Sequence, residues 1–151
     1  LERLKKAIDK KDVKVVQCKA VEELVRNSDI ICTTTPSTTP VLPDDKDLLR
    51  GKCIIAIGSY MPEMREIPDV VLDLVDNVYI ELPHACEESG DLSQPLASGK
   101  LTKDRVKLMH EYLISGEKEI KEGQTTYFKS VGMGLFDVCI AQKLYEVAKE
   151  K

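Results

Sequence analysis

The sequence lacks several residue types and patterns that common functional classes require. It contains no tryptophan and only two histidines, too few for a histidine-based metal centre. Its five cysteines include no C-x-x-C pair, which argues against a structural zinc site and against a thioredoxin motif. No apolar run reaches the roughly 18 residues that a membrane span needs. We therefore expect neither a metal site nor a membrane protein.

The charge balance argues against nucleic acid as a partner. The chain has 22 lysine and arginine residues against 26 aspartate and glutamate residues, for a net charge of −4. The basic residues are scattered along the sequence, whereas binding to a phosphate backbone requires a basic face. Hydrophobic residues make up 42% of the chain, as is typical of an ordinary globular domain.

The cysteines favour a reducing environment. Their number is odd, and a chain of 151 residues can build a core without disulfides. We interpret them as buried free thiols of a cytoplasmic protein. They are Cys18, Cys32, Cys53, Cys86 and Cys139.

Short β-branched runs alternate with amphipathic segments along the chain. Strands are predicted over 13–18, 29–35, 53–57, 78–80 and 125–128. Helices are predicted over 2–11, 21–25, 44–49, 68–75, 84–89, 104–115 and 133–150. Such alternation predicts an α/β sandwich with a mostly parallel sheet and a long C-terminal helix.

Three of the predicted strands end in segments suited to binding a ligand. These segments are 33–37 (TTTPS), 56–60 (AIGSY) and 129–132 (KSVG). In an open parallel sheet, ligands bind beyond the carboxyl ends of the strands. Hydroxyl groups, free backbone N–H groups and glycines that permit a close approach suit a nucleotide ribose or an amide-bearing ring. Each segment alone is also typical of an ordinary turn.

The same segments carry a resemblance to the ornithine cyclodeaminase/μ-crystallin family. The likeness follows the family's order from about residue 1 to the end of the chain. It is carried by 29–37 (DIICTTTPS), 51–59 (GKCIIAIGS), 62–67 (PEMREI), 88–92 (ESGDL) and 128–132 (FKSVG). The resemblance implies a partial Rossmann-like three-layer sandwich and NAD or NADP as the cofactor.

The resemblance also implies where the cofactor lies. Thr35 and Ser37 are expected beside the dinucleotide. The nicotinamide side is expected to be lined by Ala56, Ile57, Gly58 and Ser59, and closed over by Ser130, Val131 and Gly132. For Ser130 the alternative is an N-cap of the last helix.

One departure from the family concerns acid/base chemistry. Ornithine cyclodeaminases carry an aspartate as acid/base residue at the position of Tyr60 and a lysine at the position of Met64. A phenol holds its proton at neutral pH and is a poor general base. No catalytic residue is therefore assigned. Tyr60 is interpreted either as a hydroxyl near the substrate or as an aromatic residue packed in a surface loop.

A second departure concerns the glycine-rich turn that binds the cofactor's phosphates. The chain contains no G-x-G-x-x-G turn, which the family carries upstream together with its substrate domain. We therefore expect residues 1–132 to form a partial NAD(P)-binding domain that lacks its first strand and glycine-rich turn. Residues 133–151 are expected to form a helix that returns towards the substrate and dimerisation domain. A piece of this kind is expected to be inactive alone.

The function that the resemblance implies is redox chemistry at the α-carbon of an amino or cyclic imino acid. Because Tyr60 stands where cyclodeaminases carry their acid/base aspartate, we expect an imine (ketimine) reductase. The alternatives are an ornithine cyclodeaminase, which converts ornithine to proline and ammonia, and a non-catalytic μ-crystallin-like binder of NAD(P) or a small ligand. The full-length protein is expected to be a homodimer.

Other titratable residues can be interpreted either as acid/base or binding groups or as structural residues. Glu66 and Asp91 are candidates for acid/base work or for a cap or salt bridge. Arg65 is expected to pair with a nearby surface acid rather than with a substrate carboxylate. His84 and His110 are interpreted as structural, His110 because it shares a predicted helical face with apolar residues.

Overall fold

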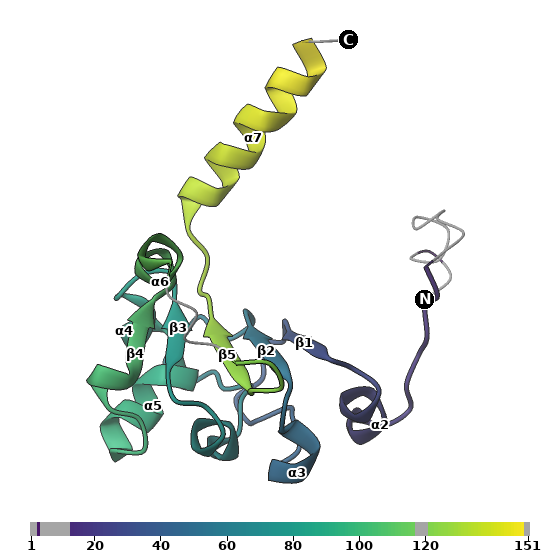
Figure 1. Ribbon diagram of the computed structural model, residues 1–151, viewed down its shortest axis with the longest axis vertical. Helices are drawn as coiled ribbons and strands as arrows, with labels where there is room; N and C mark the ends of the chain where they lie inside the picture. Colours follow the sequence, from purple (N-terminus) through teal and green to yellow (C-terminus); the bar gives the residue numbers. More distant parts are fainter. Residues whose placement is uncertain (1–2, 4–12, 117–120, 150–151) are drawn as a thin grey trace.

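The computed structural model describes residues 3, 13–116 and 121–149 (Figure 1). The helix predicted over 2–11 lies outside these residues except for residue 3. The strand predicted over 13–18 is wrong, because this segment has no regular structure and Val16 is 60% exposed. β-Branched residues favour a strand only where a neighbouring strand supplies the hydrogen-bond ladder, and residues 13–18 pair with no described strand.

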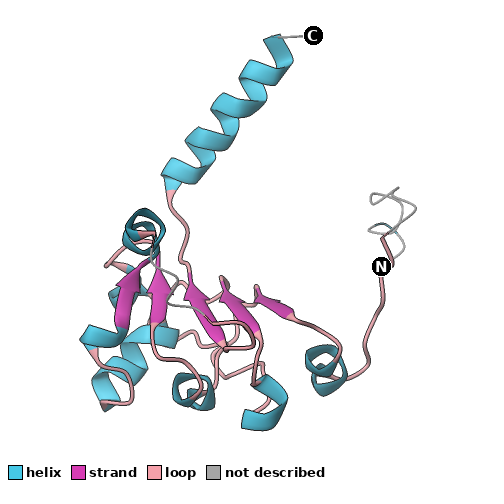
Figure 2. Cartoon of the chain, viewed as in Figure 1, coloured by secondary structure: helices cyan, strands magenta, loops and turns pink. Residues whose placement is uncertain are grey.

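The remaining elements alternate as the sequence predicts, and they form one five-stranded sheet in the order β1-β2-β5-β3-β4 (Figure 2). The strands are β1 (Ile30–Thr33), β2 (Cys53–Ala56), β3 (Val78–Ile80), β4 (Val106–Leu108) and β5 (Thr126–Lys129). The α-helices are α2 (Val21–Arg26), α3 (Lys46–Leu49), α4 (Ala85–Glu88), α5 (Gly90–Ser98), α6 (Met109–Ser115) and α7 (Gly134–Lys149). Two 3₁₀ helices, η1 (Asp69–Asp73) and η2 (Lys103–Arg105), complete the described fold.

Every pair of neighbouring strands is parallel, and the register aligns their last residues. Thr33 pairs with Ala56, Ala56 with Lys129, and Lys129 with Ile80. The segments that follow β1, β2, β5 and β3 therefore leave the sheet at one edge. We call this edge, made of residues 33–37, 56–61, 80–82 and 129–132, the carboxyl edge.

The core lies on one face of the sheet. Ile31, Ile54, Tyr127 and Val78 occupy one row across four strands and are all buried. Helices α2 to α5 and η1 contribute to the same core cluster. On the opposite face Tyr79 of β3 contacts Tyr112 of α6, with ring centroids 5.1 Å apart, whereas Ile30 of β1 is 65% exposed. The described helices thus cover the two faces unequally.

The five cysteines are free, but the prediction that they are buried is wrong. Cys32 and Cys139 are exposed, and the others are partly exposed. Cys32 points to the sparsely covered face of β1, since it alternates with the buried Ile31 and Thr33. Cys139 lies on α7, of which no residue is buried.

Three segments form other elements than the sequence pattern predicts. Residues 104–115, predicted as one helix, form the end of η2, the edge strand β4 and the helix α6. The predicted stop at Gly90 is instead the start of α5, which Ser89 caps by accepting a hydrogen bond from the Asp91 N–H. The helix predicted over 68–75 is the shorter 3₁₀ helix η1, with Pro68 at its N-cap.

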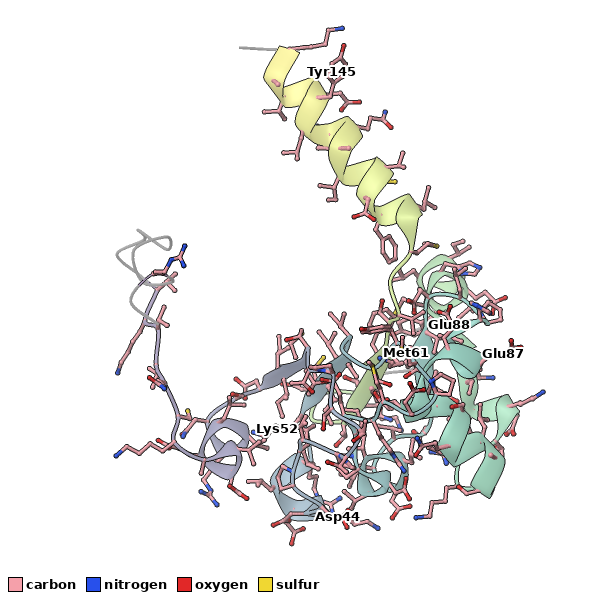
Figure 3. The ribbon with its side chains drawn as sticks, turned by 180° about the vertical axis from the view of Figure 1, so that it is seen from behind. Asp44, Lys52, Met61, Glu87, Glu88 and Tyr145 are labelled. Carbon is pink, nitrogen blue, oxygen red and sulfur yellow. The ribbon has the colours of Figure 1, made fainter. Side chains whose placement is uncertain are left out.

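Helix α7 projects away from the sheet, beyond the carboxyl edge (Figure 1). Figure 3 shows Tyr145 near its far end, remote from the other labelled residues. Leu135, Val138 and Ile140 are each about 60% exposed, because no other described element packs against the helix. No helix in the described ranges combines the length and apolarity needed to cross a membrane.

Arg105 holds the β4 side of the sheet to the η1 segment. Its guanidinium donates hydrogen bonds of 2.6 Å to the Leu72 and Val75 carbonyl oxygens through Nη2, and one of 3.0 Å to the Asp76 carbonyl oxygen through Nε. Leu72 belongs to the last turn of η1, and Val75 and Asp76 follow the helix, where carbonyl groups have no partner within it. The planar guanidinium satisfies all three at once.

We predict that Arg105→Lys destabilises the protein by about 1–3 kcal/mol, because an ammonium group cannot reach three separate carbonyls and leaves acceptors unpaired. Urea unfolding of the full-length protein measures the difference. Arg50→Lys is the matched control, since the Arg50 guanidinium is 63% exposed and lies 3.8 Å from the Asp47 carboxylate. Equal unfolding midpoints for the two variants would contradict this role of Arg105.

Candidate functional site

The carboxyl edge brings together the three segments that the sequence singled out. The Ile57 N–H donates to the Thr33 carbonyl oxygen over 2.9 Å, and the Ser130 N–H donates to the Ala56 carbonyl oxygen over 2.9 Å. Each segment is therefore fixed to the preceding strand end just where it leaves the sheet. Residues that are about 70 positions apart in the sequence become neighbours, because parallel strands end at one edge.

Glu66 ties the ends of β1 and β2 together. This residue is fully buried. One carboxylate oxygen, Oε2, accepts hydrogen bonds of 2.8 Å from the Thr33 hydroxyl and the Gly58 N–H. The other, Oε1, accepts from the Thr35 N–H at 2.5 Å and from the Thr35 hydroxyl at 2.8 Å. Four donors satisfy this buried charge, so the reading of Glu66 as a structural residue fits the contacts.

Glu81 follows β3 directly and holds another strand end, that of β5. Its Oε1 accepts hydrogen bonds from the Ser130 hydroxyl at 2.8 Å, the Val131 N–H at 2.6 Å and the Gly132 N–H at 3.0 Å. The side chain is buried. Glu81 therefore holds the turn that follows β5 against the end of β3.

A third carboxylate, Asp91, supports the loop that carries Glu66. Its Oδ1 accepts hydrogen bonds from the Glu66 N–H at 2.8 Å and the Ile67 N–H at 2.9 Å. Its Oδ2 lies 3.8 Å from Nζ of Lys129, whose side chain is also fully buried. The Lys129 ammonium donates a hydrogen bond of 3.3 Å to the Ala56 carbonyl oxygen. These contacts agree with the salt-bridge interpretation of Asp91.

Burial shifts the pKa values of Lys129, Asp91 and Tyr127. Burial lowers the pKa of Lys129 below its ordinary value, while Asp91, Glu66 and Glu81 act to raise it. Burial raises the pKa of Asp91 above its ordinary value, although hydrogen bonds from the Ile67 and Glu66 N–H groups oppose this. Burial likewise raises the pKa of Tyr127, with Asp91 adding to the rise. Lys129 forms an ion pair with Asp91, and the Glu66 and Glu81 carboxylates act on the same ammonium group electrostatically.

The glycines at this edge have two different roles. A Cβ on Gly58 would lie 2.2 Å from the Thr35 backbone N and O and 2.6 Å from Glu66 Oε1, so only glycine fits there. Gly58 therefore packs closely against protein atoms. Gly132 has a φ of +88°, and a Cβ there would meet no heavy atom within 4 Å. Its side faces open space, which leaves room for a ligand.

Most of the predicted hydroxyl ligands point inward. The Ser59 hydroxyl donates to the Met64 carbonyl oxygen at 2.7 Å and shares a hydrogen bond with Ser89, and Ser59 is fully buried. The hydroxyls of Thr35 and Ser130 are bound to Glu66 and Glu81. Ser37 donates to the Thr39 carbonyl oxygen. The sequence suggested hydroxyl groups that are available to a ligand, but those of Thr35, Ser59 and Ser130 bind protein atoms instead.

The exposed surface of the edge is mainly apolar. Its large side chains are between 38% and 51% exposed, and they are Ile57, Tyr60, Met61 and Leu82. Ala56 is buried beneath them and Val131 is half-buried. A flat apolar or aromatic ligand group therefore fits this surface better than a strongly charged one, because apolar contacts and backbone groups dominate it.

Tyr60 is half exposed, with 51% of its surface accessible. It follows the buried Ser59 directly, so the phenol stands at the rim of the edge rather than in the core. Tyr60 thus lies at the carboxyl edge, with no hydrogen-bond partner among the described residues, and both of its interpretations agree with this position.

The other predicted roles have mixed outcomes. Arg65 pairs with Asp69, as expected, and Asp69 also binds Lys100. His84 is exposed and lies 3.0 Å from the Glu88 carboxylate. The packing role of His110 is wrong, because residue 110 is exposed on a short helix. The N-cap role of Ser130 is also wrong, because α7 begins only at Gly134.

Sequence reasoning missed Lys129 and Glu81 as parts of the site. A lysine at an inward-facing strand position is a detectable signal, since charged residues are seldom buried without partners. Lys129 alternates with the buried Tyr127 on β5, which marks the position as inward. For Glu81 no local signal exists, because its partners lie about 50 residues away.

Comparison with known proteins gives a consistent picture. The model of the ornithine cyclodeaminase/mu-crystallin family matches residues 1–151. A Δ¹-pyrroline-2-carboxylate reductase of Bacillus cereus is 38% identical over 132 residues, which are 85% of this chain and 40% of the reductase. The chain therefore spans about two fifths of the length of this curated relative.

Two solved structures share the fold. A probable ornithine cyclodeaminase from Bordetella pertussis Tohama I superposes with a TM-score of 0.74 at 30% identity, over 87% of this chain and 43% of that protein. An archaeal alanine dehydrogenase dimer with bound NAD superposes with a TM-score of 0.71 at 25% identity, over 88% of this chain and 42% of that protein. Both likenesses confirm the α/β fold with a Rossmann-like parallel sheet.

We predict that Lys129→Met destabilises the protein by about 3–5 kcal/mol, because it leaves buried carboxylates without a compensating cation. Asp91→Asn keeps the Oδ1 acceptor for the Glu66 and Ile67 N–H groups while removing the charge. The Lys129→Met/Asp91→Asn double variant is therefore expected to lose less stability than the two single variants combined. Denaturant unfolding of all four proteins gives the coupling energy, and strict additivity would contradict the pairing.

The pH dependence of stability offers a second measurement. The pKa of Lys129 is lowered in the folded protein, so the unfolded chain binds this proton more tightly. The wild type is therefore expected to gain stability relative to the Lys129→Met variant as the pH rises from the folded pKa towards the ordinary value of 10.5. A constant difference in unfolding free energy across this window would contradict the shift.

Proposed function

The chain belongs to the ornithine cyclodeaminase/mu-crystallin family, and on that premise we propose that the full-length protein is an NAD(P)-dependent reductase of a cyclic imino acid. Its substrate would be a five- or six-membered cyclic imine that carries a carboxylate at the imine carbon. The single observation that carries this proposal is the carboxyl edge, where three separate segments converge on one open, largely apolar surface.

The choice of reduction over cyclodeamination rests on Tyr60. Cyclodeamination requires a group that takes up and returns protons during loss of ammonia, and a phenol at the rim of the site is poorly suited to it. Reduction needs only hydride delivery to an imine carbon whose nitrogen is already protonated. The Bacillus cereus relative, which is named for reduction of a cyclic imine, supports the same choice.

The residues at the carboxyl edge fit a dinucleotide. A nicotinamide ring is flat and mainly apolar, and it would lie against Ile57 and beside the open face of Gly132. Thr35 and Ser37 would lie along the rest of the dinucleotide, on the β1 side of the edge. The cofactor supplies the hydride when it is bound. NAD bound to the archaeal alanine dehydrogenase supports this assignment.

The protein's own contribution would be binding and orientation. Ala56, Gly58 and Ser59 would form a rigid floor, because their backbone or side chains are fixed by Glu66, Lys129 and Met64. Val131 and Gly132 would form one wall, fixed by Glu81. Apolar side chains at the rim would keep water away from the reacting imine carbon.

The domain organisation is part of the same proposal. Residues 1–132 would be the cofactor-side domain, and α7 within residues 133–151 would run to a substrate and dimerisation domain encoded elsewhere in the full-length protein. The exposed apolar residues of α7 and the two-fifths coverage of the relative support this. A homodimer is supported by the dimeric alanine dehydrogenase. Five free thiols support a reducing cytoplasm.

The test is reduction of Δ¹-pyrroline-2-carboxylate by the full-length protein with NADH or NADPH. We expect consumption of reduced cofactor that depends on the imine and yields proline, with one of the two cofactors preferred. Loss of nicotinamide absorbance and chromatography of proline measure the two sides of the reaction. The matched control is the same assay without imine, which detects non-specific oxidation.

Two outcomes would overturn the proposal in favour of one of the two alternative functions, a cyclodeaminase or a non-catalytic binder. Release of ammonia from ornithine with NAD⁺, without imine reduction, would identify a cyclodeaminase despite Tyr60. Saturable NADH binding without turnover of ornithine or of five- and six-membered cyclic imines would identify a non-catalytic binder.

A further inference from the structure

Glu81 stands out among the buried acids because three donors of one short turn converge on a single carboxylate oxygen. The Ser130 hydroxyl and the Val131 and Gly132 N–H groups all donate to the same oxygen, Oε1. Successive N–H groups that converge on one anion form an anion-binding turn, or nest. Here the bound anion is a side chain of the protein itself.

This arrangement determines which side of the turn is free. The Gly132 N–H points inward to Glu81 and also to the Ser130 hydroxyl at 3.1 Å. The Gly132 φ of +88° is a conformation that other residues rarely adopt. A Cβ at Gly132 would meet no heavy atom within 4 Å beyond its chain neighbours, so this side of the turn faces open space. The carboxylate therefore holds the turn from below and leaves its outer side open at the carboxyl edge.

Glu81 also interacts electrostatically with a buried cation, Lys129. Glu81 and Lys129 attract each other electrostatically, since Glu81 raises the pKa of Lys129 against the effect of burial. Lys129 precedes Ser130 directly on β5, so the same strand end provides the cation and the turn. Glu66 has the corresponding role at the ends of β1 and β2. Each glutamate thus supports a different part of the edge.

We propose that Glu81 is a positioning residue that holds the Ser130–Gly132 turn in the shape that binds the nicotinamide half of the dinucleotide. This inference rests on the proposed function for the identity of the ligand. Its structural part, the holding of the turn, does not. Loss of Glu81 would release three donors and allow a glycine-containing turn to sample other conformations, which lowers its affinity for the nicotinamide.

The experiment compares two ligands on the full-length protein. NADH contains the nicotinamide, and ADP-ribose is the same molecule without it. For Glu81→Ala we expect NADH to bind at least about tenfold more weakly, because three hydrogen bonds to a charged group are lost. A tenfold change in affinity corresponds to about 1.4 kcal/mol. ADP-ribose is expected to bind with unchanged affinity. Calorimetric titration measures both.

Two further variants separate positioning from general damage. Glu81→Gln retains an oxygen that can accept the same hydrogen bonds, so it is expected to recover much of the NADH affinity, and it remains informative if Glu81→Ala does not fold. Glu111→Ala changes an exposed glutamate of α6 and is expected to bind both ligands like the wild type. Equal weakening of NADH and ADP-ribose by Glu81→Ala would overturn the proposal.

Hydrogen exchange tests the turn independently of any ligand. The Val131 and Gly132 amides are expected to exchange faster in Glu81→Ala than in the wild type, while the core amides of β2 keep their protection. Unchanged exchange at these two amides would overturn the inference even if NADH binds. Failure of the wild type to bind either NADH or NADPH, with faster exchange in the variant, would instead overturn the proposed function and leave the holding of the turn intact.

Discussion

Buried carboxylates that accept hydrogen bonds from the ends of parallel strands are the interaction on which the candidate site depends. A strand that leaves a sheet no longer has a neighbouring ladder for its N–H groups, and buried donors without partners are costly. Glu66 satisfies such donors after β1 and β2, and Glu81 satisfies them after β5. The shape of the carboxyl edge therefore follows from side chains beneath it, not from the strands alone.

This solution has an electrostatic consequence. Buried carboxylates are costly without a nearby cation, and here Lys129 pairs with Asp91 and also interacts electrostatically with Glu66 and Glu81. The site is consequently a layered structure, with charges and hydroxyls below and apolar side chains such as Ile57 and Met61 above. Polar residues here build the floor of the site, and the backbone and apolar groups are left to contact a ligand.

Several features were predictable from local pattern. The apolar run that ends at Ala56 and the β-branched run around Ile31 formed strands as expected, because one face of each is buried in the core. The edge strand β4 was missed, since its three residues lie next to α6 and share a helical pattern with it. The run 13–18 failed as a strand for the opposite reason. Its residues favour the β-conformation, but no described strand pairs with it.

The sequence by itself determined the α/β class, the family resemblance and the three segments that meet at the carboxyl edge, because hydrophobic periodicity and short motifs are local properties. Only the tertiary structure decided the direction of the hydroxyls of Thr35, Ser59 and Ser130, which face inward. It alone also revealed the role of Glu81. The physical reason is distance along the chain: a hydrogen bond between residues 81 and 130 depends on strand order, and strand order is not encoded in any short stretch of sequence.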